Sequence, residues 1–136
     1  MDALPFWPAG TAAVLCVAGP HAIPVSTAVR AGDRRVLLAL GGRRETLRRL
    51  RRDPAAALCV MAEGLAFTAK GEARVVKEGV EAAPALVVVE LAVAELVDHL
   101  ADGRTEMQAP PAWQWLDQKA AESEPLIRAE LEALAA

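Results

Sequence analysis

Short apolar segments separated by turn residues recur along most of the chain, and this pattern constrains the fold more than any other feature. Residues 11–18 are apolar, and after a Gly-Pro-His turn they are followed by residues 22–30, where apolar and β-branched side chains alternate with others. Two such runs around a turn predict a β-hairpin. Residues 35–40 are almost wholly apolar, which predicts a short strand buried on both faces.

The same pattern continues beyond residue 54. Residues 55–62 predict an apolar strand, and the alternation in residues 65–76 is typical of a half-buried antiparallel strand. The valine-rich run 85–100 fits helix or strand by periodicity, and its valine content favours strand. Together with the earlier segments, these runs predict six antiparallel strands that form a small barrel, in a mainly β fold that is α+β in the loose sense.

The C-terminal part, from residue 110 onward, has a helical pattern. In its last helix we expect Ser123 as the N-terminal cap and Pro125 in the first turn. The expected apolar stripe of this helix consists of Leu126, Ile127, Leu131 and Leu134.

A chain of 136 residues with 54% hydrophobic residues predicts a single domain with its own core. We place the barrel at about residues 10–107 and the helical segment at about 110–134. The net charge of -3 does not favour nucleic acid as a partner. The N-terminus is acidic and contains prolines, and no run of eighteen apolar residues occurs, so we expect a cytoplasmic protein with no membrane partner.

The remaining polar residues and cysteines give no sign of a metal site. Cys16 and Cys59 each lie in an apolar run and are expected to be buried strand residues. His21 and His99 have no second ligand at a suitable spacing, so no metal is predicted.

The segment 43–52 carries six arginines and is expected to form a short helix. Leu47 and Leu50 lie three residues apart and would dock it, while Asp53 and Pro54 end it. At about 100° per residue, one flank beside the leucines carries Arg44, Arg48 and Arg51, and the far side carries Glu45, Arg49 and Arg52. The far side is explained by solvent and by a Glu45–Arg49 pair.

The other arginines need a separate explanation. Gly41 and Gly42 precede the helix, and such a turn offers backbone N–H groups and the positive end of the helix dipole to an anion. Arginine adds bidentate donors that suit phosphate oxygens. The basic segment is therefore either a solvated surface or a phosphate-binding turn.

Four motifs in this order resemble a known family: "HAIPVSTAV", "DRRVLLAL", "LRRLRRDPAAALCV" and "GEARVV". Over residues 10–107 the chain resembles the pyridoxamine 5'-phosphate oxidase-like FMN-binding split barrels. This resemblance implies a six-stranded antiparallel split β-barrel with a short inserted helix and C-terminal helices. It also implies a homodimer that binds FMN or a deazaflavin between its subunits, and an oxidoreductase that moves a hydride to or from a small organic molecule.

The resemblance also implies site residues. The flavin ring would lie against Val25, Ser26 and Thr27 on one strand and Leu38, Ala39 and Leu40 on its neighbour. The phosphate would lie at Arg43, Arg44 and Thr46, with Arg48 as a further positive charge. The chain departs from the family pattern at three positions, since members with a firm cofactor site commonly have threonine, serine and lysine where this chain has Leu40, Arg44 and Thr46.

Two functional hypotheses follow from these departures. The first is a flavin- or deazaflavin-dependent oxidoreductase, in which the cofactor supplies the catalysis. The second is a non-catalytic dimer that keeps the barrel but has lost the flavin or binds another ligand in its groove. In either case the valine-rich run 85–97 is expected to contribute to an apolar dimer interface, and Trp113 and Trp115 are expected to pack in the core or that interface.

Overall fold

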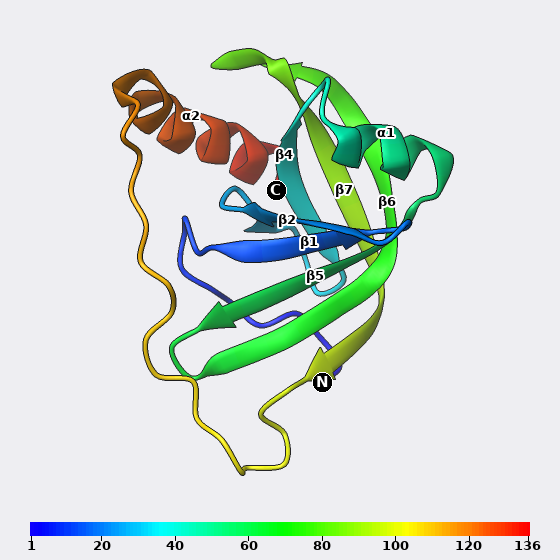
Figure 1. Cartoon of the computed structure of the whole chain (residues 1–136), viewed down its shortest axis with the longest axis vertical. Helices are drawn as coiled ribbons and strands as arrows, with labels where there is room; N and C mark the ends of the chain where they lie inside the picture. The colour runs from blue at the N-terminus through cyan, green and yellow to red at the C-terminus, as the bar shows by residue number, and fades with distance from the viewer.

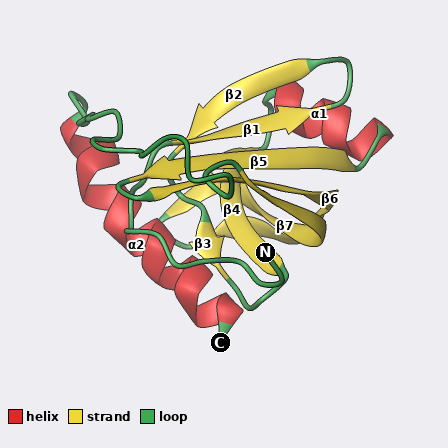
Figure 2. Ribbon diagram, turned by 90° about the horizontal axis from the view of Figure 1, so that it is seen from below, coloured by secondary structure: helices red, strands yellow, loops and turns green.

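The computed structural model describes the whole chain, residues 1–136, as one curved antiparallel sheet with two helices outside it (Figures 1 and 2). The sheet has seven strands in the order β2-β1-β5-β6-β7-β4-β3. The strands are β1 (Ala13–Val17), β2 (His21–Val25), β3 (Val29–Arg30), β4 (Arg35–Gly41), β5 (Ala55–Ala62), β6 (Leu65–Val80) and β7 (Ala83–Asp98). The helices are α1 (Glu45–Arg52) and α2 (Gln118–Ala135).

The sheet curls around one main core but does not close. Twenty buried residues form this core, and Phe67, Leu15, Leu58, Leu38 and Leu91 are among its fully buried side chains. The edge strands β2 and β3 do not pair with each other, so the barrel remains split between them. The mainly β, split-barrel class predicted from sequence fits this architecture.

The strand count differs from the predicted six because the run 22–30 divides into two strands. β2 pairs with β1, whereas β3 pairs with β4 at the opposite edge of the sheet. Between them, the Thr27 hydroxyl accepts a hydrogen bond from the Ala39 amide (3.1 Å) and donates one to the Ala39 carbonyl (3.4 Å). A side chain thus joins this segment to β4 where regular strand pairing is interrupted.

The valine-rich run is a strand, as its composition indicates. β7 pairs with β6 on one side and with β4 on the other. Val87, Val89, Leu91 and Val93 lie in the main core, and Val88 lies in a second, smaller core beneath α2. Four of its valines and Leu91 are therefore buried within one chain, and a contribution of this run to a dimer interface stays a prediction.

Strand alternation also explains where the cysteines lie. Leu15 and Val17 point into the core from β1, so Cys16 between them faces outward and is exposed. Cys59 has the same position between buried neighbours on β5 and is half-buried. The prediction that both cysteines are buried is wrong, because an apolar run does not reveal which of its faces is covered.

The helices agree with the sequence analysis only in part. Leu47 and Leu50 bury α1 against the main core, as predicted. α2 begins at Gln118 rather than near residue 110, and its cap is Asp117, whose side chain accepts from the Ala120 amide (3.2 Å). Ser123 lies inside the helix and donates to the Lys119 carbonyl (2.8 Å), so its predicted role as a cap is wrong.

The apolar stripe of α2 is narrower than expected. Ile127 and Leu131 are buried against the outer face of β4 and β7 with Leu37 and Val88. Leu126 and Leu134 are exposed, because the contact surface accommodates only the other two. Neither helix combines the length and apolar character that a membrane span requires.

Candidate functional site

The turn from β4 into α1 has features of an anion-binding turn. The Gly42 amide donates to the Ala85 carbonyl (2.8 Å), which fixes the turn against β7. Arg44 occupies the N-cap position with extended backbone, and no side chain caps the helix. An arginine side chain has no acceptor for the first N–H groups of a helix, so these groups are left for solvent or an external anion.

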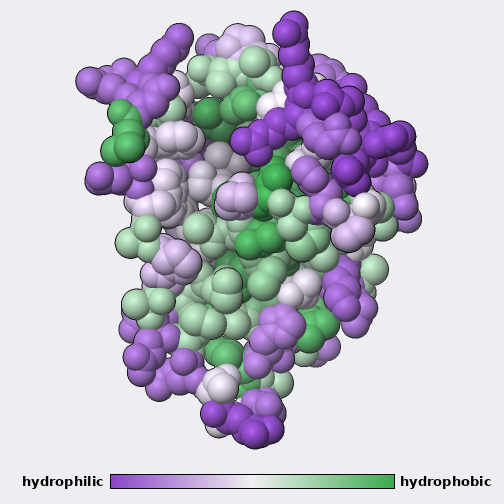
Figure 3. Space-filling model, in the orientation of Figure 1, coloured by the Kyte–Doolittle hydropathy of each residue, from purple (hydrophilic) through white to green (hydrophobic).

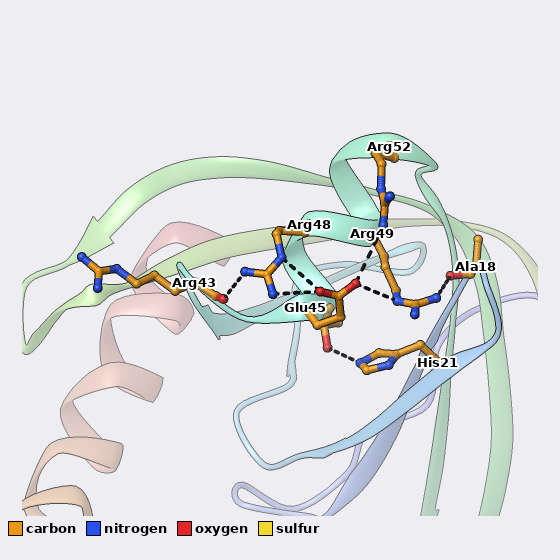
Figure 4. Close-up of polar contacts among 8 residues, drawn as sticks. Ala18, His21, Arg43, Glu45, Arg48, Arg49 and Arg52 are labelled. Carbon is orange, nitrogen blue, oxygen red and sulfur yellow. Dashed lines mark hydrogen bonds and ion pairs between the residues drawn. The ribbon is translucent and has the colours of Figure 1, made fainter.

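A single carboxylate, that of Glu45, is the ion-pair partner of three of the six arginines (Figure 4). Glu45 lies 2.8 Å from Arg48, 3.3 Å from Arg49 and 3.8 Å from Arg52. The hydrogen bond from Arg48 is the main reason that the pKa of Glu45 lies below its usual range. Arg48 also donates to the carbonyl oxygen of Arg43 (2.8 Å). Arg48, predicted to help bind phosphate, therefore lies in this ion-pair cluster.

Two arginines remain without a carboxylate partner. Arg51 pairs with Glu78 on β6 at 3.0 Å. Arg43 and Arg44 make no ion pair, and both are exposed next to the glycine turn. The two arginines that have no carboxylate partner therefore both lie at the start of α1.

Thr46 faces away from this turn. Its side chain is buried, and its hydroxyl lies 3.0 Å from the Nε2 atom of His21, which joins α1 to β2 (Figure 4). Arg49 strengthens the same junction through a longer bond of 3.4 Å to the Ala18 carbonyl. The sequence placed Thr46 at the phosphate and gave no role to His21, because their contact depends on how the β1–β2 hairpin folds over the helix.

The residues predicted to line the flavin ring fall on two faces of the sheet. Leu38 and Leu40 point into the main core, and Val25 packs against it. Ala39 points to the opposite face, against the second core under α2. Ser26 and Thr27 meet this outer face, since Thr27 bonds to Ala39 and Ser26 donates to Glu124 on α2. Ser26, Thr27 and Ala39 are therefore the only residues of this predicted set whose side chains lie together on the outer face of the sheet.

Glu124 is a site residue that the sequence analysis did not identify. Its carboxylate is buried, and it accepts from Ser26 and from the Trp115 indole (2.5 Å). Arg128 lies 3.5 Å from the same carboxylate. Nothing in the sequence separates Glu124 from the other glutamates of α2, so no local pattern could have singled it out.

The tryptophans cover part of the same region. Trp115 stacks edge-on with Trp113 at a centroid distance of 5.6 Å, and Trp113 donates to the Gly10 carbonyl (2.9 Å). Both indoles remain partly exposed. They pack against each other and the segment before β1 rather than in the main core.

The space-filling view shows the surface beside α1 (Figure 3). Apolar side chains gather over the middle of the face that contains β1 and β5, and hydrophilic residues of α1 lie beside them. The structure contains no cluster of three or more histidine, cysteine or carboxylate side chains that could hold a metal. Its polar chemistry near the predicted site consists of arginines at one end and the Ser26–Glu124–Trp115 contacts at the other.

Several solved structures share this architecture. A pyridoxamine 5'-phosphate oxidase-like protein of Listeria innocua matches with a TM-score of 0.53 and 17% identity, over 65% of this chain and 88% of its own. An F420 reductase matches with a TM-score of 0.55 and 10% identity, over 65% and 90%. A heme binding protein of Mycobacterium smegmatis matches with a TM-score of 0.52 and 20% identity, over 65% and 48%.

The fold is that of the pyridoxamine 5'-phosphate oxidase-like split barrels. No model of a known protein family matches the sequence. No curated protein matches it either. Structural likeness thus confirms the split barrel recognised from the sequence motifs. The likeness is one of fold alone, and the ligands named for these neighbours are properties of those proteins.

Proposed function

We propose that this split barrel binds FMN or a deazaflavin and acts as an oxidoreductase that transfers a hydride to or from a small organic molecule. The observation that carries this proposal is the pair of arginines without carboxylate partners, Arg43 and Arg44, at a glycine turn that leads into a helix without a side-chain cap. The fold supports it, since an F420 reductase has the same architecture. F420 is itself a deazaflavin.

The phosphate end of such a cofactor fits the residues present. Arg43 and Arg44 would donate to the phosphate oxygens, and the first N–H groups of α1 would add donors along the helix dipole. Arg48 would act indirectly, because its hydrogen bond to the Arg43 carbonyl holds the backbone of the turn in place. The turn is further held by the bond between Gly42 and Ala85.

The ring end would lie near the outer surface formed by Ser26, Thr27 and Ala39. A bound flavin supplies the hydride chemistry, and the chain contributes position and exclusion of water. Thr27 holds the backbone of Ala39, so it would set the position of this strand edge. The Ser26 hydroxyl is bound to Glu124, which would therefore be the polar group closest to the ring among those on α2.

Absorption spectroscopy of the purified protein tests this function. We expect flavin-type absorbance, or thermal stabilisation that rises with the concentration of added FMN or F420, since a ligand that binds only the folded state stabilises it. A colourless protein whose unfolding temperature does not respond to either compound would contradict the proposal.

One observation favours the alternative of a non-catalytic split barrel that has lost the flavin or binds another ligand. α2 covers the outer face beside Ala39, and Glu124 already satisfies the Ser26 hydroxyl. A flavin ring that lay flat on β4 would have to displace α2 from this face and break the hydrogen bond between Ser26 and Glu124. A structure of the protein with FMN soaked in would distinguish the two, because the alternative predicts the present α2 contacts and no ring density.

We further propose that the protein is a homodimer. The outward faces of β1, β2 and β5 carry a continuous uncharged surface, because cross-strand pairing brings Val14 next to Pro24 and Cys59, and Cys16 next to Ala22 and Ala57. A second copy is the occupant that suits such a flat patch, since two-fold symmetry brings the same surface of each copy together.

Light scattering of paired variants tests the dimer. The parent should have a dimer mass at micromolar concentration, and Cys16→Arg should be monomeric because it places a charge in the uncharged patch. Ala94→Arg, on an exposed site of β7, should remain dimeric. A monomeric parent, or dimers of both variants, would contradict this interface.

A further inference from the structure

A crevice lies between α1 and β6. Its volume is about 350 Å³. α1 lies beside β6 (Figure 1), and it docks mainly through Leu47 and Leu50. The sheet is irregular here, with changes of register between Val75 and Lys77 and between Glu78 and Val80. Such bulges bend a strand, and this bend leaves space between β6 and α1.

The crevice has apolar walls and a charged mouth. Leu47, Leu50, Val75 and Val89 line the walls. The charged lining residues are Arg51, Arg74 and Glu78. Small-molecule sites typically combine apolar walls with a few polar groups, and this volume lies at the lower end of their usual range of about 300–1,000 Å³.

The two arginines are weakly held by the protein's own carboxylates. Arg51 pairs with Glu78 at 3.0 Å, but both side chains are more than half exposed, and such surface pairs contribute little to stability. Arg74 lies 3.4 Å from Glu90, whose other oxygen receives two shorter bonds from Arg35. An external carboxylate can therefore replace Glu78 at Arg51 and also meet the exposed Arg74, while Glu90 keeps its two bonds from Arg35.

We propose that this crevice binds a medium-chain monocarboxylate, with its alkyl chain among the apolar walls and its carboxylate between Arg51 and Arg74. Apart from its three charged residues, the crevice is lined by residues with apolar side chains, which suits a saturated chain better than a polar molecule. The mouth carries two positive charges and one negative charge, which suits a single anionic head group. The site is separate from the α1 turn, so it does not depend on cofactor binding there.

Calorimetric titration with octanoate tests the proposal on the intact protein. We expect one saturable site. Arg51→Gln should weaken binding at least about tenfold, because it removes a charge-assisted donor, while Arg52→Gln should stay within about twofold. Arg52 is the matched control, since it is an exposed arginine of the same helix that does not line the crevice.

A second pair of variants tests the apolar walls. Val75→Phe should fill the crevice and abolish octanoate binding, whereas Val76→Phe, on the neighbouring exposed position of β6, should not. Thermal unfolding of each variant shows that it is folded. Absence of saturable binding by the parent, equal effects of the two arginine variants, or equal effects of the two phenylalanine variants would each overturn the proposal.

Discussion

Replacing Glu90 with glutamine should destabilise the fold in a pH-dependent manner. Glu90 lies on β7, and its side chain is only 10% exposed. Arg35 on β4 donates two hydrogen bonds to one of its oxygens, at 3.0 and 2.8 Å, and Arg74 on β6 lies 3.4 Å from the other. The hydrogen bonds from Arg35 are the main reason that the pKa of Glu90 lies below its usual range.

The magnitude follows from these contacts. A hydrogen bond to a charged group contributes about 1.5–3 kcal/mol. The Arg35 side chain is 45% exposed and that of Arg74 is 74% exposed, so solvent screens both, and glutamine keeps one acceptor oxygen. We therefore expect a loss of about 1–2 kcal/mol in the free energy of unfolding at pH 7. For a chain of this length that is roughly 3–8 °C in melting temperature.

The sign of the pH dependence is fixed by the lowered pKa. The stabilisation by ionised Glu90 is fully present above the unfolded pKa of about 4.3, and it is lost as the pH falls through the lower folded value. Thermal unfolding followed by circular dichroism should therefore show the largest difference between parent and Glu90→Gln near neutral pH and a smaller one near about pH 3.

Glu95→Gln is the control for this experiment, because Glu95 is exposed on the same strand and makes no ion pair. It should leave the melting temperature nearly unchanged at both pH values. Equal stability of parent and Glu90→Gln at pH 7, or a difference that stays constant across this pH range, would refute the reasoning.

Two further predictions concern packing. Gly71→Ala should lower the free energy of unfolding in urea by at least about 2 kcal/mol, because a Cβ atom there would lie 1.8 Å from the Ala92 carbonyl oxygen. Gly41→Ala should lower it much less, because its Cβ atom would meet only the flexible side chain of Arg44, and equal losses would contradict this close approach. Glu124→Ala should shift tryptophan fluorescence to longer wavelength, because the Trp115 indole loses its hydrogen-bond acceptor and becomes more hydrated. Glu132→Ala, at an exposed position of the same helix, should leave the spectrum unchanged. An unchanged spectrum for Glu124→Ala would show that the contact with Trp115 does not form.

Much of the sheet could be predicted from sequence because its strands are short and bounded by turns. The hairpin β1–β2 and the strands β4, β5 and β6 follow the apolar pattern. The valine content identified β7 where periodicity did not decide. Leu47 and Leu50 predicted the docking face of α1 because each residue of a short helix has a fixed angular position.

The remaining features depend on contacts between distant segments. The division of residues 22–30 into β2 and β3 rests on the contact of Thr27 with Ala39, which no local pattern encodes. The helical wheel placed Arg49 on a solvated far side and Arg48 on the flank beside the leucines, but Arg48 pairs with Glu45 and is 62% exposed, whereas Arg49 is 27% exposed and donates to the Ala18 carbonyl. These contacts depend on the long side chains and on the β1–β2 turn, which the wheel does not include. Glu124 could not be recognised because its burial arises from α2 packing across the sheet.

FMN titration of two arginine variants tests the central claim most directly. Arg44 makes no ion pair and lies at the glycine turn. Arg52 is the last residue of α1, and its guanidinium group lies 3.8 Å from the Glu45 carboxylate. At fixed salt, Arg44→Ala should weaken FMN binding at least about tenfold, and Arg52→Ala should change it by no more than about twofold. Equal effects of the two substitutions, or no measurable binding of FMN by the parent, would contradict the account of the basic turn as a phosphate site.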